Sequence, residues 1–316
     1  MGAVKEILGV SIGSSARDHT VEVDLLGERF RIRREGTDGS LDRAEARISQ
    51  MDGKVAAFGM GGIDIYLRAD GHDYYFREAK RLRRAAVETP IVCGSGLKGA
   101  VEASTVRYMT DTLGLDLRGK KVLMTSAVDR WGMAEGLHDA GCELVFGDLL
   151  YALDIPILIR RWGTLRLLVR AITPIAAQMP FSWLYPTGSS QEKTYTGKHE
   201  AMYREADIIA GDWQFVRRYM PEDMSGKWIL TNTTTAKDLE FLRDRGVELI
   251  VTSTPRLGGR SFGTNVIEAT MVALKGASGP LEESEYLELL DRVGFKPDVV
   301  WLQQMPPVGD TDALET

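Results

Sequence analysis

The 316-residue sequence has few of the residues that mark metal clusters, disulfide scaffolds or nucleic-acid-binding surfaces. It contains two cysteines, Cys93 and Cys142, and four histidines. The cysteines lie far apart in the chain and the histidines are scattered, which excludes a disulfide-rich scaffold and indicates no metal site. Lys and Arg total 39 against 45 Asp and Glu, so the formal charge of -6 gives no overall positive field for nucleic acid. We therefore expect a cytoplasmic protein with reduced thiols that binds neither metal nor nucleic acid.

Long uncharged hydrophobic runs are also missing. The most apolar stretch, residues 149–185, is interrupted by Asp154 and by several arginines. A membrane-spanning helix needs about 20 consecutive apolar residues, so no membrane span is expected. The N-terminus carries Lys5 and Glu6 and lacks the basic and apolar regions of a secretory signal, so we expect no export.

Hydrophobic residues make up 44% of the sequence and charged residues 27%, which is typical of a globular chain long enough for two domains. In the first third, short strand patterns alternate with Gly-rich turns, and Ser40 is placed to cap a helix. The strands expected there are residues 7–12, 20–25, 29–33, 55–59 and 90–93, and the helices are 40–51, 77–84 and 97–115.

From Leu117 onward, continuous β-rich runs alternate with helical patterns, which is typical of a parallel sheet buried on both faces. The sequence thus predicts an α/β fold: a Rossmann-like doubly wound parallel sheet domain after a smaller N-terminal α/β domain. Strands are expected at 121–126, 142–146, 207–210, 227–232 and 248–253, and helices at 131–140, 235–245 and 266–275. The expected domains are residues 1–115 for substrate, residues 116–276 for nucleotide, and residues 277–316 as a C-terminal helix and tail returning toward the N-terminal domain.

Residues 149–206 form an insertion that is too long for a simple crossover. Within it, Leu165–Arg170 begins an amphipathic helix that carries arginines. Its apolar face packs in the core or in a dimer interface, and docking on a membrane surface or a phosphate is the alternative. We expect a homodimer.

The turn from Thr125 to Gly132 follows a buried strand and opens a helix, which is where a dinucleotide pyrophosphate binds. It lacks the G-x-G-x-x-G fingerprint, but small side chains permit a close approach, and Gly132 stands where the last glycine allows the helix to pack on the strand. A turn without ligand is the alternative. The residues of this turn that are expected at the cofactor are Thr125, Ser126, Ala127, Asp129, Arg130 and Gly132.

Further cofactor contacts are expected after the later strands. Asp148 follows the second strand at the spacing of a carboxylate that binds ribose hydroxyls, or else it is a plain strand-end cap. A carboxylate there would repel a 2′-phosphate, so NAD is favoured over NADP. Asn232, Thr233 and Thr234 follow the fourth strand and Thr254 follows the fifth, at the edge where open α/β sheets bind ligands.

Substrate contacts are expected in the N-terminal half. Ser14, Ser15 and His19 occupy the turn after the first strand, where hydroxyl and imidazole groups can hold a hydroxylated or carboxylated molecule. A solvated turn is the alternative. Asn265 lies in a polar edge before the helix at 266–275, so we place it near the same cleft.

Lys98 and Asp64 are the catalytic candidates. Lys98 stands near the start of the helix at 97–115, where the helix dipole opposes its charge and tends to lower its pKa. Asp64 follows a strand end with three glycines. The hypothesis is that Lys98 relays a hydroxyl proton and Asp64 orients it, while the alternative is a plain surface lysine.

The layout resembles the shikimate and quinate dehydrogenase family. The stretch 117–124 is similar to the segment before that family's first nucleotide-domain strand, Thr231–Thr235 resembles its Asn-Ala-Thr-Pro segment, and Ser15 and His19 match its substrate-binding Ser-x-Ser turn best. Proteins with this whole-chain pattern carry the label quinate 5-dehydrogenase. The resemblance implies an NAD(P)-dependent oxidoreductase acting on a small hydroxylated carboxylic acid, although the family's glycine-rich turn and catalytic lysine have no clear counterpart.

Two other functions fit the same residues. The missing glycine fingerprint favours another adenosine ligand, as in an S-adenosylmethionine-dependent methyltransferase, and Asp148 would bind that ribose equally well. The insertion at 149–206 favours a non-catalytic ligand sensor or assembly protein.

Overall fold

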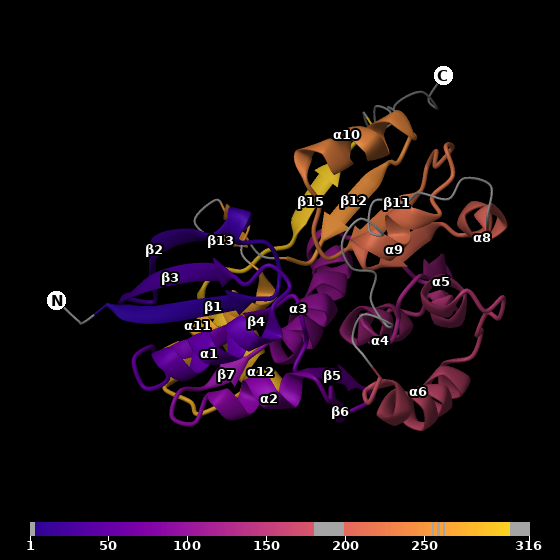
Figure 1. Ribbon diagram of the computed structural model, residues 1–316. Helices are drawn as coiled ribbons and strands as arrows, with labels where there is room; N and C mark the ends of the chain where they lie inside the picture. Colours follow the sequence, from indigo (N-terminus) through magenta and orange to yellow (C-terminus); the bar gives the residue numbers. More distant parts are fainter. Residues whose placement is uncertain (1–3, 180–198, 255, 258–259, 262, 304–316) are drawn as a thin grey trace, which may run out of the picture.

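Two sheets with parallel strands, one in each half of the chain, organise the structure (Figure 1). The computed structural model describes residues 4–179, 199–254, 256–257, 260–261 and 263–303. Helices cover both faces of each sheet, so the predicted α/β fold class is confirmed.

The first sheet has the order β2-β3-β1-β4-β7. The central strand β1 pairs in parallel with β3 and β4, while β2 forms an antiparallel hairpin with β3. The alternation expected around residue 30 is present, because Phe30 and Ile32 are buried and the arginines between and beside them face outward. The strands are β1 (Lys5–Ser11), β2 (His19–Leu25), β3 (Glu28–Gly36), β4 (Ala57–Gly61) and β7 (Ile91–Val92).

Helices α1 and α2 cover one face of this sheet, and α3, α11 and α12 cover the other. Ser40 caps α1 as predicted, since its side chain accepts a hydrogen bond from the Arg43 amide at 3.2 Å. The bounds are α1 (Leu41–Met51), α2 (Ala79–Ala85), α3 (Ser95–Arg107), α11 (Thr264–Lys275) and α12 (Glu283–Arg292), and α3 continues into a π-helical turn, Tyr108–Thr112.

The second sheet has the order β15-β12-β11-β10-β8-β9. All pairs are parallel except β12 with β15. In this sheet β8 lies between β9 and β10, although both follow it in the chain. The strand order therefore switches sides between β8 and β10. Ligands bind at such a switch point in doubly wound sheets. The strands are β8 (Lys121–Met124), β9 (Glu143–Phe146), β10 (Ile208–Gly211), β11 (Trp228–Thr231), β12 (Leu249–Thr252) and β15 (Asp298–Trp301).

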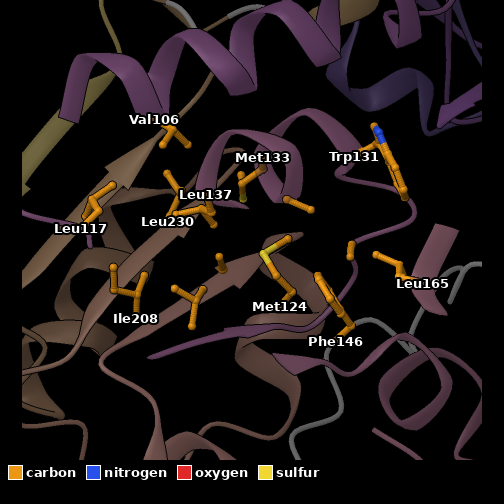
Figure 2. Close-up of a cluster of buried hydrophobic side chains, with 14 of the residues drawn as sticks. Val106, Leu117, Met124, Trp131, Met133, Leu137, Phe146, Leu165, Ile208 and Leu230 are labelled. Atoms are coloured by element: carbon orange, nitrogen blue, oxygen red, sulfur yellow. The ribbon is translucent and has the colours of Figure 1, made fainter. Parts of the chain in front are cut away.

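Two buried cores cover this sheet. On one face, α3, α4 and α6 pack over the strands, and Figure 2 shows Val106, Met133 and Leu137 above Met124 and Ile208. The other face is covered mainly by α9 and α10, with α8 beside them. The bounds are α4 (Trp131–Asp139), α6 (Trp162–Ala176), α8 (Glu200–Glu205), α9 (Trp213–Arg218) and α10 (Ala236–Asp244). Since Val106 belongs to α3, that helix joins the cores of both domains.

The expected assignment of the C-terminal third needs correction. We placed helix 266–275 in the nucleotide domain, but α11 packs on β1 and β4 of the first sheet, because Gly59 leaves room for its backbone at Asn265. The following α12 packs on α3, toward the N-terminal domain as expected. The tail then returns to the second sheet, where β15 pairs with β12 and buries Leu302.

The insertion contains α5 (Asp148–Leu153) at its start, then α6 and α8, and its residues 180–198 lie outside the described part of the chain. Leu165 and Val169 of α6 are buried in the core beside β8, so the helix uses its apolar face as core. Arg166 and Arg170 both pair with Asp70. No helix within the described ranges combines the length and apolar character that crossing a membrane requires.

Two hairpins were not expected. β5 (Tyr66–Ala69) and β6 (His72–Tyr75) form one, and β13 (Arg256–Leu257) and β14 (Arg260–Ser261) form the other. Asp70 and Gly71 at the first turn have φ of 50° and 72°. An Asp-Gly pair between strand-forming residues is a strong hairpin signal, and the sequence interpretation overlooked it.

Candidate functional site

A cavity of about 410 Å³ lies between the ends of strands from the two sheets. The carboxyl ends of β4 and β7 border it on one side, and those of β8, β10 and β11 on the other. Its charged lining consists of three carboxylates and two cations, which are Asp64, Asp129, Asp212, Lys98 and Arg130. Both sheets thus direct charged side chains into the space where α/β proteins bind ligands.

Lys98, in the first turns of α3, connects the two domains. Its Nζ donates a hydrogen bond to Asp129 Oδ1 at 3.0 Å and lies 3.7 Å from Asp64 Oδ2. Asp64 follows β4, whereas Asp129 follows β8. The structure therefore brings both residues of the proposed catalytic pair to one point and adds a carboxylate from the other domain.

The environment of Lys98 differs from the sequence expectation of a lowered pKa. Burial does lower the pKa of the Lys98 ammonium, but the carboxylates of Asp129 and Asp64 outweigh burial and hold the pKa above its ordinary value. At the start of α3 the Glu268 side chain accepts a hydrogen bond from the Gly94 amide. The carboxylates around Lys98 thus favour its charged form.

The pKa of the Asp64 carboxyl is also shifted in this cavity. Burial raises the pKa of the Asp64 carboxyl, Lys98 lowers it and the charge of Asp129 raises it again, with a net upward shift. A carboxyl with a raised pKa beside a cation is suited to accept and return a proton. The upward pKa shifts at both residues do not favour the expected proton relay by Lys98.

Arg130 is enclosed by carboxylates. Its guanidinium lies 3.1 Å from Glu102 Oε1 and 3.2 Å from Asp129 Oδ2, and it also pairs with Asp212. Only 7% of Arg130 is exposed. These ion pairs link α3 to the second sheet. Arg130 also lines the cavity, and its expected contact with a cofactor stays a prediction.

The start of α4, where a dinucleotide pyrophosphate was expected, is filled by protein. Glu102 of α3 is buried, and its Oε2 accepts a hydrogen bond from the Met133 amide in the first turn of α4 at 3.2 Å. Gly132 also lies against α3, because a Cβ built on it would come within 2.3 Å of the Gly99 carbonyl oxygen. Gly132 therefore lets α4 pack on α3, whereas we expected it to let the helix pack on a strand. Because protein atoms occupy the start of α4, these residues do not fit a pyrophosphate.

The rest of the predicted cofactor turn holds the second sheet together. Thr125 Oγ1 donates to the Ala210 carbonyl at 3.3 Å, and Ser126 Oγ accepts from the Asp212 amide at 2.9 Å. Ala127 is fully buried. These side chains join the end of β8 to the end of β10, so their small size serves the packing of the switch point.

Asp148 also contacts this turn. Its Oδ1 accepts a hydrogen bond from the Val128 amide at 2.8 Å, while its Oδ2 is buried without a hydrogen-bond partner among the described residues. Burial raises the pKa of the Asp148 carboxyl to about 6. One oxygen therefore has the strand-end capping role that we kept as the alternative to ribose binding.

Of the four cofactor contacts expected after β11 and β12, which are Asn232, Thr233, Thr234 and Thr254, Asn232 alone lines the cavity. Its Nδ2 donates to Asp212 Oδ2 at 3.0 Å and its Oδ1 accepts from the Trp213 amide at 3.1 Å. Thr233 is exposed, and Thr254 contacts Asn232 only through a backbone hydrogen bond of 2.9 Å. Thr233, Thr234 and Thr254 thus lie at the same sheet edge without reaching the cavity.

A smaller cavity of about 220 Å³ adjoins the first, since Gly61, Gly62 and Asn265 line both. His19 and Arg34 line its other side. Two of the expected substrate residues, His19 and Asn265, therefore lie together.

Ser14 and Ser15, also expected at the substrate, shape the neighbouring turn instead. Ser14 Oγ accepts from the Ala16 amide at 3.2 Å, and Ser15 Oγ donates to Asp38 at 3.0 Å. Both serines are exposed and neither lines the cavities.

Sequence reasoning missed Asp212 and Gln214, which the start of α9 places in the cavity, and Arg34 of β3. Asp212 directly follows a buried strand, the same signal that singled out Asp148. Within the described ranges, no group of three or more His, Cys, Asp or Glu side chains is arranged to hold a metal ion.

Comparison with known proteins gives family matches without an activity. The family described as "Domain of unknown function (DUF8754)" matches residues 96–302, and "Domain of unknown function (DUF8753)" matches residues 6–93. None of the curated proteins matches the sequence.

Solved structures with a similar fold include both enzymes and binding proteins. An NAD-dependent malic enzyme from Thermotoga maritima is 10% identical with a TM-score of 0.40, covering 92% of this chain and 85% of that one. An L-tryptophan dehydrogenase from Nostoc punctiforme is 9% identical with a TM-score of 0.39, covering 92% and 79%. A glucose-galactose binding protein from Geobacillus stearothermophilus is 9% identical with a TM-score of 0.37, covering 96% and 100%. At these values the functions of the neighbours are not transferred.

Proposed function

We propose a function from the cavity itself, because the chain belongs to the family described as "Domain of unknown function (DUF8754)", a description that assigns no activity. The protein is proposed to be an enzyme that transfers a proton to or from a hydroxyl group of a small hydroxylated carboxylic acid bound between the domains. The observation that carries the proposal is the contact of Lys98 with Asp64 and Asp129 in the interdomain cavity.

In this proposal Asp64 is the general base. Its carboxylate accepts a hydrogen bond from the ligand hydroxyl, and the Lys98 ammonium donates a hydrogen bond to the hydroxyl oxygen. The two groups are thus placed to take the proton and to balance the negative charge in a reaction at the carbon that carries the hydroxyl. Asp129 holds Lys98 at 3.0 Å, so the ammonium is oriented before the ligand arrives.

The adjoining cavity supports the carboxylic acid part of the proposal. His19 and Arg34 line it, and Arg34 donates to Asp18 Oδ1 at 2.8 Å through one of its nitrogens. An imidazole and a guanidinium are suitable partners for a carboxylate. Gly61, Gly62 and Asn265 line both cavities, so the two spaces lie next to each other.

The test uses a binding panel of hydroxylated acids that includes quinate, shikimate, lactate and indole-3-lactate, followed by thermal unfolding. A ligand at about 100 times its dissociation constant adds roughly 2.7 kcal/mol to the free energy of unfolding. Lys98→Met and Asp64→Asn should each abolish the stabilisation against thermal unfolding that these ligands give the wild-type protein. The matched controls are Lys80→Met and Asp24→Asn, which alter exposed residues away from the cavity. Binding that survives both cavity substitutions would refute the proposal.

An NAD-dependent oxidoreductase acting on a quinate- or shikimate-like acid is the second candidate. The same contact of Asp64 with Lys98 favours it, because alcohol oxidation also requires removal of the hydroxyl proton. Nicotinamide, when bound, would accept the hydride. Since Glu102 fills the pyrophosphate position at α4, we derive no step through the cofactor.

Thermal unfolding with NAD, NADP and S-adenosylmethionine separates the candidates. Because protein side chains fill the start of α4, we expect none of these three molecules to stabilise the fold. Stabilisation by NAD that is lost in Asp148→Ala would favour the oxidoreductase over the cofactor-free enzyme.

A further inference from the structure

An apolar chamber of about 160 Å³ adjoins the charged cavity. Asp129 and Phe215 line both spaces, so the two lie next to each other. The walls of the chamber come from α6, from β5 and from the segment around Leu149 and Ile159. Its α6 wall is formed by Leu165, Leu168, Val169, Ile172, Thr173 and Ala176.

Asp148 stands out in this lining. Its Oδ1 is satisfied by the Val128 amide, but Oδ2 is buried and has no hydrogen-bond partner among the described residues. A buried carboxylate oxygen without a donor costs about 1–3 kcal/mol, so an apolar chamber is an unfavourable place for it unless a donor arrives. A ligand N–H or O–H group in the chamber would supply that donor.

We propose that the chamber binds a planar apolar group of about the size of indole that carries one N–H or O–H donor toward Asp148. The proposal rests on the proposed function in one respect: the polar part of the same ligand lies in the charged cavity. A molecule with a hydroxylated acid at one end and an aromatic ring at the other then fills both spaces.

The size and polarity of the chamber favour this class of group over a polyol. Cavities of about 150 Å³ lined by Leu, Ile and Phe stay dry and bind aromatic rings. Each hydroxyl of a quinate-like ring placed there without a partner would cost about 1–3 kcal/mol. The ligand therefore resembles an aryl hydroxy acid more closely than quinate.

Indole and benzofuran are the probes, measured by calorimetric titration of the full chain. They have nearly the same shape, but benzofuran has a ring oxygen where indole has its N–H. Wild-type protein should bind indole at least tenfold more tightly than benzofuran. In Asp148→Asn the side chain offers the ligand either an NH₂ group, which cannot accept a hydrogen bond, or its one oxygen, which the Val128 amide already uses. The ratio of the affinities for indole and benzofuran should therefore fall to near one.

Filling the chamber gives the second arm. Ala176→Trp should abolish indole binding, while Ile175→Trp, at a position 64% exposed on the same helix, should leave it unchanged. If Ala176→Trp does not fold, Ile172→Trp replaces it, because Ile172 also lines the chamber and is 41% exposed.

Equal affinity for indole and benzofuran in wild-type protein, no binding of either, or retained indole binding in the filled variant would each overturn the inference. Lys98→Met and Asp64→Asn should not affect indole, since neither residue lines the chamber. If the proposed function is wrong, only the measurements with the hydroxylated acids will contradict it. If the proposed indole site is wrong, only the indole titrations will contradict it.

Discussion

Glu268 is a single buried carboxylate whose hydrogen bonds connect three helices. It is fully buried in α11, its Oε2 accepts from the Gly94 amide, and its Oε1 accepts from the Tyr286 hydroxyl at 2.6 Å. Tyr286 in turn accepts from the Leu281 amide at 3.0 Å. One acid therefore ties α11 to the start of α3 and to α12.

Replacing Glu268 by Gln should destabilise the fold although the two side chains have the same shape. Both oxygens accept hydrogen bonds, so the amide NH₂ of Gln would face either the Gly94 amide, which only donates, or the Tyr286 hydroxyl, which would then lose the acceptor for its own proton. The expected loss is about 2 kcal/mol in the free energy of unfolding, measured by urea denaturation. Glu240→Gln, at an exposed position of α10, is the control and should change little. Equal midpoints for the two variants would contradict this account.

At this scale the sequence indicated which residues meet but not what each one does. Lys98 and Asp64 were both identified, because glycines before a helix and after a strand mark places where backbone turns toward a cleft. The role of Lys98 depends on its contact with Asp129, which lies far away in the sequence. The direction of the Lys98 pKa shift follows from Asp129 and Asp64, and no local pattern brings these two carboxylates to Lys98.

Between elements, the contact of α3 with α4 depends on glycine. A Cβ on Gly132 would lie 2.3 Å from the Gly99 carbonyl oxygen, which is backbone and cannot rotate away. Gly132→Ala should therefore push the helices apart and destabilise the fold by about 1–3 kcal/mol.

Gly163 provides the matched comparison. It lies near the start of α6, and a Cβ there would meet nothing within 4 Å. Gly163→Ala should stabilise the fold by about 0.5–1 kcal/mol, because alanine favours the helix. Thermal unfolding of the two variants should give midpoint shifts of opposite sign, and a stabilised Gly132→Ala would show that α3 and α4 are free to separate.

Local patterns predicted most of the elements well. The predicted strands agree with β1 to β4 and β7 to β12 within three residues at each end, because alternation and continuous β-rich runs reflect local burial. The sheet to which a helix belongs is not a local property. The pattern of α11 fits either sheet, and the close approach at Gly59 decides for the first.

For the whole molecule, the domains are joined by a charge network rather than by a flexible linker alone. Lys98 and Glu102 of α3 reach Asp129 and Arg130 after β8, and Arg130 reaches Asp212 after β10. Several carboxyls near this junction and in the cores have raised pKa values, among them Asp64, Glu102, Asp148 and Glu268. Desolvation by burial is the first cause in each.

Stability should therefore fall as the pH rises from about 4 to 7. The pKa of Asp148 is raised from 3.8 to about 6 and that of Glu268 from 4.5 to about 7. Between each pair of values the folded state binds more protons than the unfolded state, so the free energy of unfolding decreases with pH. Carboxyls with lowered pKa values, such as Glu35 and Asp70, oppose the trend at the acid end of this window, because their ordinary pKa values are 4.5 and 3.8.

Urea denaturation at a series of pH values from about 4 to 7 measures this slope. Asp148→Asn removes one of the groups and should flatten the part of the slope between pH 4 and 6, whereas Asp24→Asn, at an exposed strand position, should leave it unchanged. A free energy of unfolding that rises across the window would mean that the buried carboxyls are ionised and fully paired in the folded protein. Asp64 would then lack the raised pKa that suits it to carry a proton.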